Sequence, residues 1–133
     1  MPVTTDPTVI GRELESLVSR AIREVTIEAT ANLIESTPVD TGWARANWIP
    51  AIGSPTPQSV GSERAVSTAM QQAGLASLLS YRLSRGPVWI SNKTPYIRRL
   101  DGGWSKQAPA GFVRQAIARA VSVVQAKVSR WRP

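Results

Sequence analysis

Residues 90–112, ISNKTPYIRRLDGGWSKQAPAGF, set several chain reversals among a few aromatic and basic side chains. The pattern predicts a strand end at Ile90–Asn92, followed by a short helix that starts at Pro95 and reaches Leu100. Two glycines then predict a stop, and a later Pro and Gly predict the start of a long C-terminal helix. Such a stretch indicates a shaped surface rather than a catalytic pocket.

Composition sets the broad class of protein. The chain has 133 residues and neither cysteine nor histidine, so we expect one domain over residues 1–133. Disulfides, thiolate zinc sites and cysteine nucleophiles are excluded, as are the commonest general base and metal ligand. We therefore expect no enzyme and no cofactor. The apolar runs are too short to span a bilayer, and the start MPVTTDPTV lacks the pattern of a signal peptide, so we expect a soluble protein made in the cytoplasm.

The net charge of +7 is unevenly distributed along the chain. Residues 1–60 contain seven acids and four bases, whereas residues 61–133 contain two acids and twelve bases. A basic half suggests binding to nucleic acid, to an acidic protein, or to the acidic half of a neighbouring copy. A solvated basic face without a partner is the alternative.

A long N-terminal helix is predicted to begin at Asp6-Pro7 and to end before Pro38. Between them, apolar residues recur at steps of three and four: Ile10, Leu14, Leu17, Val18, Ala21, Ile22, Val25, Ala29 and Leu33. About 30 residues of helix are ~45 Å long, against a radius of gyration of ~14 Å for a domain of this size. Either the helix bends, or one end projects and packs on another subunit.

The middle of the chain predicts a small sheet. Loose alternation from Trp43 to Ile52 indicates a strand ended by Pro50 or Gly53, with one of its two tryptophans in the core and the other facing a partner or lying under a loop. Residues 54–61 are rich in Pro, Gly and Ser and predict a flexible loop. A strand over 87–92, with Val88 and Ile90 on one side, is its natural antiparallel mate.

Two further helices complete the predicted fold. One runs from Glu63 to about Arg82, and Gly74 could kink it or end it early. The other presents an apolar face at the C-terminus: Phe112 or Val113, Ala116, Ile117, Ala120, Val121, Val124, Val128 and Trp131. The fold class predicted is α+β: a long N-terminal helix, a small antiparallel sheet, a second helix, a short helix and a C-terminal helix.

Catalytic motifs are lacking, whereas basic and aromatic residues are interleaved around the short helix. Lys93, Arg98, Arg99 and Lys106 flank Tyr96 and Trp104, as in many binders of single-stranded nucleic acid. This predicts weak electrostatic attraction to DNA without reading of sequence. The alternative is that the two arginines only solvate the outer face of the short helix and the aromatics pin loops to the core.

Two segments carry a resemblance to a known family. They are STPVDTGWARANW, residues 36–48, and ISNKTPYIRRLDGGWSKQAPAGFV, residues 90–113. With a long helix before them and a helix after, they resemble the tail-completion or neck proteins of long-tailed bacteriophages, a family of minor tail proteins. Two departures from the family pattern are Asp101, where Glu is expected, and the Pro-rich insertion near Pro55 and Pro57.

The resemblance implies a structural virion protein at the head-tail junction, assembled as a ring, commonly a hexamer, that completes the tail tube. Implied partners are other copies, the tail tube protein, the head-tail connector or terminator proteins, and genomic DNA in the channel. The expected contact residues are Arg45, Asn47, Trp48, Tyr96, Arg98, Arg99, Trp104 and Lys106. A small basic DNA-binding protein is the alternative.

Overall fold

The structure is a computed structural model, and it describes residues 6–38, 43–56, 64–95, 97–103 and 110–131. Its elements in chain order are α1 (Pro7–Ser36), α2 (Trp43–Ala46), β1 (Ile49–Ile52), α3 (Arg64–Ser77), β2 (Val88–Ser91), α4 (Ile97–Asp101) and α5 (Phe112–Val128), with 3-10 turns η1 (Leu78–Ser80) and η2 (Leu83–Arg85) between α3 and β2. The predicted α+β class is confirmed. No helix in these ranges is both long and apolar enough to cross a bilayer.

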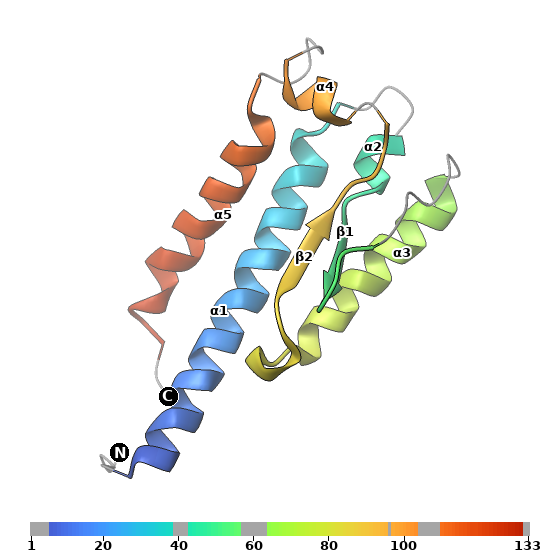
Figure 1. Ribbon diagram of the computed structural model, residues 1–133. Coiled ribbons are helices and arrows are strands. Elements are labelled where there is room, and N and C mark those ends of the chain that lie inside the picture. The colour runs from blue at the N-terminus through green and yellow to red at the C-terminus, as the bar shows by residue number, and fades with distance from the viewer. Residues whose placement is uncertain (1–5, 39–42, 57–63, 96, 104–109, 132–133) are drawn as a thin grey trace.

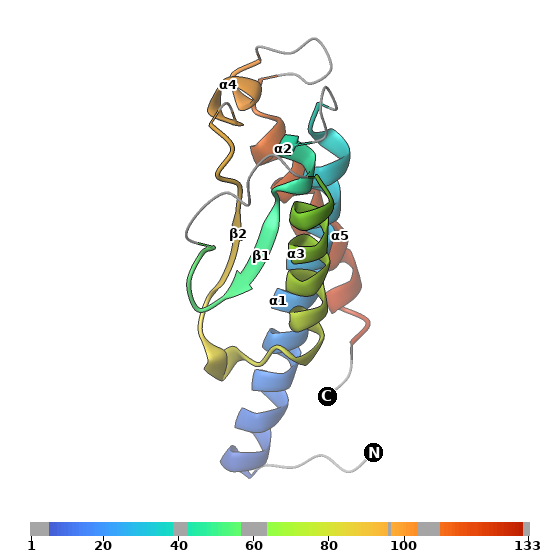
Figure 2. The ribbon, with the colours of Figure 1, turned by 90° about the vertical axis from the view of Figure 1, so that its right-hand side faces the viewer.

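The elements are arranged around α1. Figure 1 shows α5 alongside α1 in the opposite direction, with the two-stranded β1–β2 sheet on the other side of α1. Figure 2 shows α3 next to β1. The first turns of α1 extend beyond all the other labelled elements in both views. The prediction that one end of the long helix projects is therefore confirmed, while its packing on another subunit remains a prediction.

Both ends of α1 follow the sequence signals. An Asp6 carboxylate oxygen accepts a hydrogen bond from the Thr8 amide at 2.9 Å, with Pro7 at the first helical position. At the other end, the Thr37 amide donates to the Leu33 carbonyl at 3.1 Å, and Pro38 follows. These caps fix the length of the helix at 30 residues.

The core lies at the C-terminal end of α1. Leu33, Trp48, Phe112 and Ala116 are its buried members, each at most 5% exposed, and they come from α1, the α2–β1 junction and α5. The Asn32 amide also donates to the Ala116 carbonyl at 3.1 Å, which ties α1 directly to α5. Three separate parts of the chain are therefore joined at this end.

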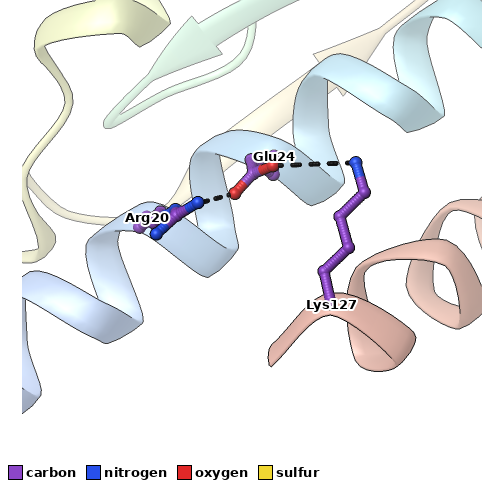
Figure 3. Close-up of polar contacts among 3 residues, drawn as sticks. All are labelled: Arg20, Glu24 and Lys127. Atoms are coloured by element: carbon purple, nitrogen blue, oxygen red, sulfur yellow. Dashed lines mark hydrogen bonds and ion pairs between the residues drawn. The ribbon is translucent and has the colours of Figure 1, made fainter. Parts of the chain in front are cut away.

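Surface charges hold the other end of α5 against α1. Glu24 accepts a hydrogen bond from Arg20 at 3.1 Å and lies 3.9 Å from the Lys127 ammonium group (Figure 3). The Arg20 guanidinium also lies 4.1 Å from the centre of the Trp131 ring. Because these charges are partly exposed, each pair stabilises the fold by less than about 1 kcal/mol.

The sheet departs from the sequence prediction at its start. Residues 43–46 form a helical turn, and the strand begins only at Ile49, where it pairs antiparallel with Ser91. In this antiparallel pair, residues before Ile49 would have to pair with residues after Ser91. There the chain turns toward Pro95, which has no amide hydrogen to donate to a neighbouring strand. The predicted strand from Trp43 is therefore wrong in its first half. Pro50 lies inside the strand, so the stop is at Gly53, whose φ is 90°.

The predicted faces of the second strand are confirmed. Ile90 packs against the core, whereas Trp89 is 45% exposed. The Trp89 indole nitrogen donates to the Gly53 carbonyl at 3.2 Å, just past the end of β1. Trp89 therefore pins the turn after β1.

The second helix ends earlier than predicted. It continues through Gly74, which lies against β1, and stops at Ser77 instead of Arg82. Beyond it, side-chain contacts to α1 hold the chain in 3-10 turns. Tyr81 is 1% exposed, and its carbonyl accepts a hydrogen bond from Arg23 at 3.0 Å. These tertiary bonds outweigh the helical periodicity of the segment.

The apolar face predicted for α5 is only partly covered. Phe112, Ala116, Ala120 and Val124 are buried, whereas three other members of the predicted face remain exposed: Ile117, Val121 and Val128, at 42%, 40% and 45%. The helix is therefore more apolar than its contacts within the chain require.

Candidate functional site

The described parts of the two segments that carry the family resemblance meet at one end of the molecule. Figure 1 shows α2, α4, the end of α1 and the start of α5 gathered there. We call this region the α2–α4 end and define it by the described residues 33–37, 44–48, 92–95, 97–103 and 110–113. Most of its polar motif residues hydrogen-bond within the chain.

Trp48 and Thr37 form the first link. The indole nitrogen of Trp48 donates to the Thr37 hydroxyl at 2.8 Å, and that hydroxyl donates to the Leu33 carbonyl at 2.5 Å. Both side chains are at most 5% exposed. The Trp48 ring is therefore part of the core, and the expectation that it faces a partner is corrected, because its polar atom is satisfied within the chain.

Arg45 closes the C-terminal end of α1. Its Nε donates to the Thr37 carbonyl at 3.1 Å, and a terminal nitrogen donates to the Glu35 carbonyl at 3.2 Å. The last carbonyls of a helix have no partner within it and carry a partial negative charge, so a guanidinium is a favourable cap. The half-buried Arg45 side chain is thus engaged within the chain.

Asn47 is also enclosed. It is 1% exposed, so the expectation that it contacts another subunit is corrected as well. Nearby, the Gln71 amide of α3 donates to the carbonyls of Arg45 and Trp48, at 3.1 and 3.0 Å. These two carbonyls lie in a short helical turn and just before a strand, where regular secondary structure offers them no backbone donor. The Gln71 amide supplies that donor instead.

Asn92 joins the second motif segment to the first. Its amide nitrogen donates to the Ala44 carbonyl at 2.7 Å, and its oxygen accepts from the Thr94 amide at 3.1 Å and from the Thr94 hydroxyl. Thr94 is 3% exposed. One short side chain therefore satisfies backbone groups from two segments 48 residues apart. Its position at the end of a predicted strand was the sequence signal that could have identified it.

Asp101 links α4 to α5. A carboxylate oxygen accepts from the Val113 amide at 3.1 Å, and the Asp101 carbonyl accepts from the Gly111 amide at 2.7 Å. Gly111 has φ 79° and no side chain to cap α5, so Asp101 supplies the acceptor from a distance. Its negative charge at a helix N-terminus is also favourable.

Basic side chains are exposed at this same end. Lys93, Arg98 and Arg99 are all exposed, and Arg98 and Arg99 belong to α4. Tyr96, Trp104 and Lys106, the other expected contact residues here, lie outside the described residues. Of the eight expected contact residues, Arg98 and Arg99 are thus the ones that the structure brings together as a surface.

A second polar region lies at the opposite end of the molecule. A cavity of about 490 Å³ opens between α1 and residues 79–82, and Arg12, Arg23 and Arg82 contribute to its wall. Arg23 is engaged with the Tyr81 carbonyl, and the Ser19 hydroxyl in the wall accepts from the Leu83 amide. Glu15 lies in the same wall and offsets part of the positive charge.

The described part of the chain holds no group of three or more acidic, His or Cys side chains placed to bind a metal ion. Comparison of the chain with protein-family models, with curated proteins and with solved structures gave no significant match in any of the three.

Proposed function

We propose that this chain is a structural subunit of a long-tailed bacteriophage, which completes the tail tube and joins it to the head as part of a ring, commonly of six. The observation that carries the proposal is the α2–α4 end. There, two segments that resemble the tail-completion family meet, interlock by hydrogen bonds and present Lys93, Arg98 and Arg99 outward. A hydrogen-bonded end with exposed guanidinium groups is suited to protein contacts.

The proposed role is assembly, not catalysis. The motif residues Trp48, Asn92 and Asp101 position backbone segments, and the exposed basic residues make the contacts with tail tube or connector proteins. Because Arg98 and Arg99 are on a five-residue helix fixed by Asp101 at its end, their positions are defined before a partner arrives. Preorganisation of this kind reduces the entropy lost on binding.

The test is made in the phage whose genome encodes this chain. Deleting the gene should leave filled heads and uncompleted tails that do not join, as seen by electron microscopy. Adding the purified protein should restore infectious particles. The Arg98→Ala/Arg99→Ala double variant should restore far fewer, whereas Arg85→Ala, an exposed basic change on η2, should act like wild type. Joined particles without the gene product would refute the proposed function.

A second candidate function is non-specific DNA binding, and the same three exposed basic residues favour it. Phosphate contacts release counterions, so DNA affinity would fall steeply with salt, by about 0.9 in log–log slope for each contact. Titration at two salt concentrations measures that slope.

The Arg98→Lys/Arg99→Lys variant separates the two functions. Lysine keeps the charge and loses the planar two-pronged donor. Non-specific phosphate binding should tolerate the exchange, whereas a protein contact with carboxylates should weaken. Unchanged DNA affinity together with lost particle joining would favour assembly.

A further inference from the structure

Two apolar stripes remain exposed among the described residues. On α1, Ile10, Leu14 and Val18 are 38%, 57% and 42% exposed. On α5, Ile117, Val121 and Val128 are exposed to a similar degree, 40–45%. We call them the α1 stripe and the α5 stripe. In each, the side chains are spaced by whole or nearly whole helical turns and so lie on one face.

The α1 stripe continues an interface that already exists. Steps of seven residues, two helical turns, lead from Val18 through Val25 to Asn32, whose amide donates to α5 at Ala116. The stripe therefore lies on the side of α1 that faces α5. Trp131, just beyond the end of α5, lies over Arg20, so α5 does not extend along α1 to the stripe. Figure 1 shows these first turns of α1 projecting past α5.

We propose that the α1 stripe of one copy packs on the α5 stripe of a second copy. The two match in length: Ile10 to Val18 spans about 12 Å and Ile117 to Val128 about 16 Å of helix. They also match in charge, because α1 contains five acids and three bases, whereas α5 contains three bases and no acid. Glu13 is three residues from Ile10, and Arg114 is three residues from Ile117, which places opposite charges beside the two stripes.

The proposed contact is head-to-tail: each copy offers its α1 stripe to one neighbour and its α5 stripe to another. A symmetric contact between two α1 stripes would leave both α5 stripes in water, whereas a head-to-tail contact covers one stripe of each kind at every junction. Repetition of such a contact closes into a ring or continues as a filament. The inference rests on the proposed function only for the ring; the contact itself follows from the two stripes.

The test measures self-association of the full chain by sedimentation velocity over a concentration series. Wild type should grow beyond the monomer as concentration rises. Leu14→Gln and Val121→Gln should each move the midpoint of association up by about ten-fold or more, because each removes apolar surface from one stripe. Leu79→Gln is the matched control, since Leu79 is 73% exposed on η1, outside both stripes, and it should associate like wild type.

A mixing experiment then identifies the geometry. Leu14→Gln retains an intact α5 stripe and Val121→Gln an intact α1 stripe, so an equimolar mixture should form one-to-one dimers that grow no further. Native mass spectrometry with one variant isotope-labelled measures the stoichiometry of this mixed dimer directly. Circular dichroism checks that each variant folds; if one does not, Val18→Gln or Ile117→Gln replaces it.

Three results would overturn the inference. They are a wild-type chain that stays monomeric throughout the series, a stripe variant that associates like wild type, and a mixture without the one-to-one dimer. None of these would bear on whether the gene is needed to join heads to tails, so the interface and the proposed function can fail separately.

Discussion

Replacing Gly74 by alanine tests how closely α3 approaches the sheet. A Cβ atom at this position would lie 2.4 Å from the Pro50 carbonyl oxygen and 3.0 Å from Pro50 Cδ. Ordinary contacts begin at 3.4 Å, so helix and strand would have to separate by about 1 Å. The obstructing oxygen is part of the backbone and cannot rotate away.

Two opposing effects set the expected magnitude. Alanine in a helix is favoured over glycine by about 1 kcal/mol. Overpacking a well-filled contact costs about 1–3 kcal/mol, and this contact is with backbone. Separating α3 from β1 also weakens the two hydrogen bonds of Gln71, each of which contributes about 1 kcal/mol. The net expectation is a loss of about 2–3 kcal/mol in the free energy of unfolding.

Gly11 provides the matched control. It also lies inside a helix, but nothing is within 4 Å of the position that a Cβ atom would take there. Gly11→Ala should therefore raise the free energy of unfolding by about 0.5–1 kcal/mol. Urea unfolding followed by circular dichroism measures both variants, and thermal midpoints should move by about 3–4 °C per kcal/mol. If Gly74→Ala stabilised the protein as Gly11→Ala does, the close approach of α3 to β1 would be wrong.

Three further predictions concern the free energy of unfolding, measured in the same way. Trp48→Phe should lower it by about 2–3 kcal/mol, through a lost buried hydrogen bond and a cavity, whereas Trp89→Phe on the exposed face should lower it by less than about 1 kcal/mol; equal losses would contradict the different burial of the two rings. Asn92→Ala should lower it by about 2–3 kcal/mol, because it leaves backbone groups of two segments without partners; a loss below about 0.5 kcal/mol would contradict that linking role. Asp101→Ala should lower it by about 1–2 kcal/mol, the usual effect of removing a helix cap, and Asp101→Asn by less, since the acceptor oxygen is kept; an equal loss in both would assign the effect to charge alone.

The sequence was most informative where many residues carry the same signal. In α1 the cap at Asp6, the stop at Pro38 and the apolar stripe between them all agree, and the helix was predicted within a residue or two. The short segment around Ala44 offered only a loose alternation. Its conformation is decided by an Asn92 side chain 48 residues away, which no local pattern contains.

In the candidate site, too, some features could be predicted from the local sequence and others depend on contacts between distant residues. Exposure of Arg98 and Arg99 follows from the polarity of a short helix and was predictable. Burial of Trp48 was not, because it depends on the Thr37 hydroxyl as a partner for the indole nitrogen. Gly74 was expected to weaken its helix, but its role is to admit the Pro50 carbonyl, a contact that only the packed structure contains.

The motif residues of the α2–α4 end have a role within the chain, whereas its exposed residues are available to a partner. Trp48, Asn92 and Asp101 satisfy backbone or hydroxyl groups inside the chain, so a sequence that retains them retains a way of folding. Their hydrogen bonds hold the fold of this end, and the choice of partner is left to the residues that the same end exposes. A protein with this end and without basic residues at Arg98 and Arg99 would keep the fold and change its partners. The function is therefore best tested at those two exposed arginines, with the free energy of unfolding of each variant measured beside its binding.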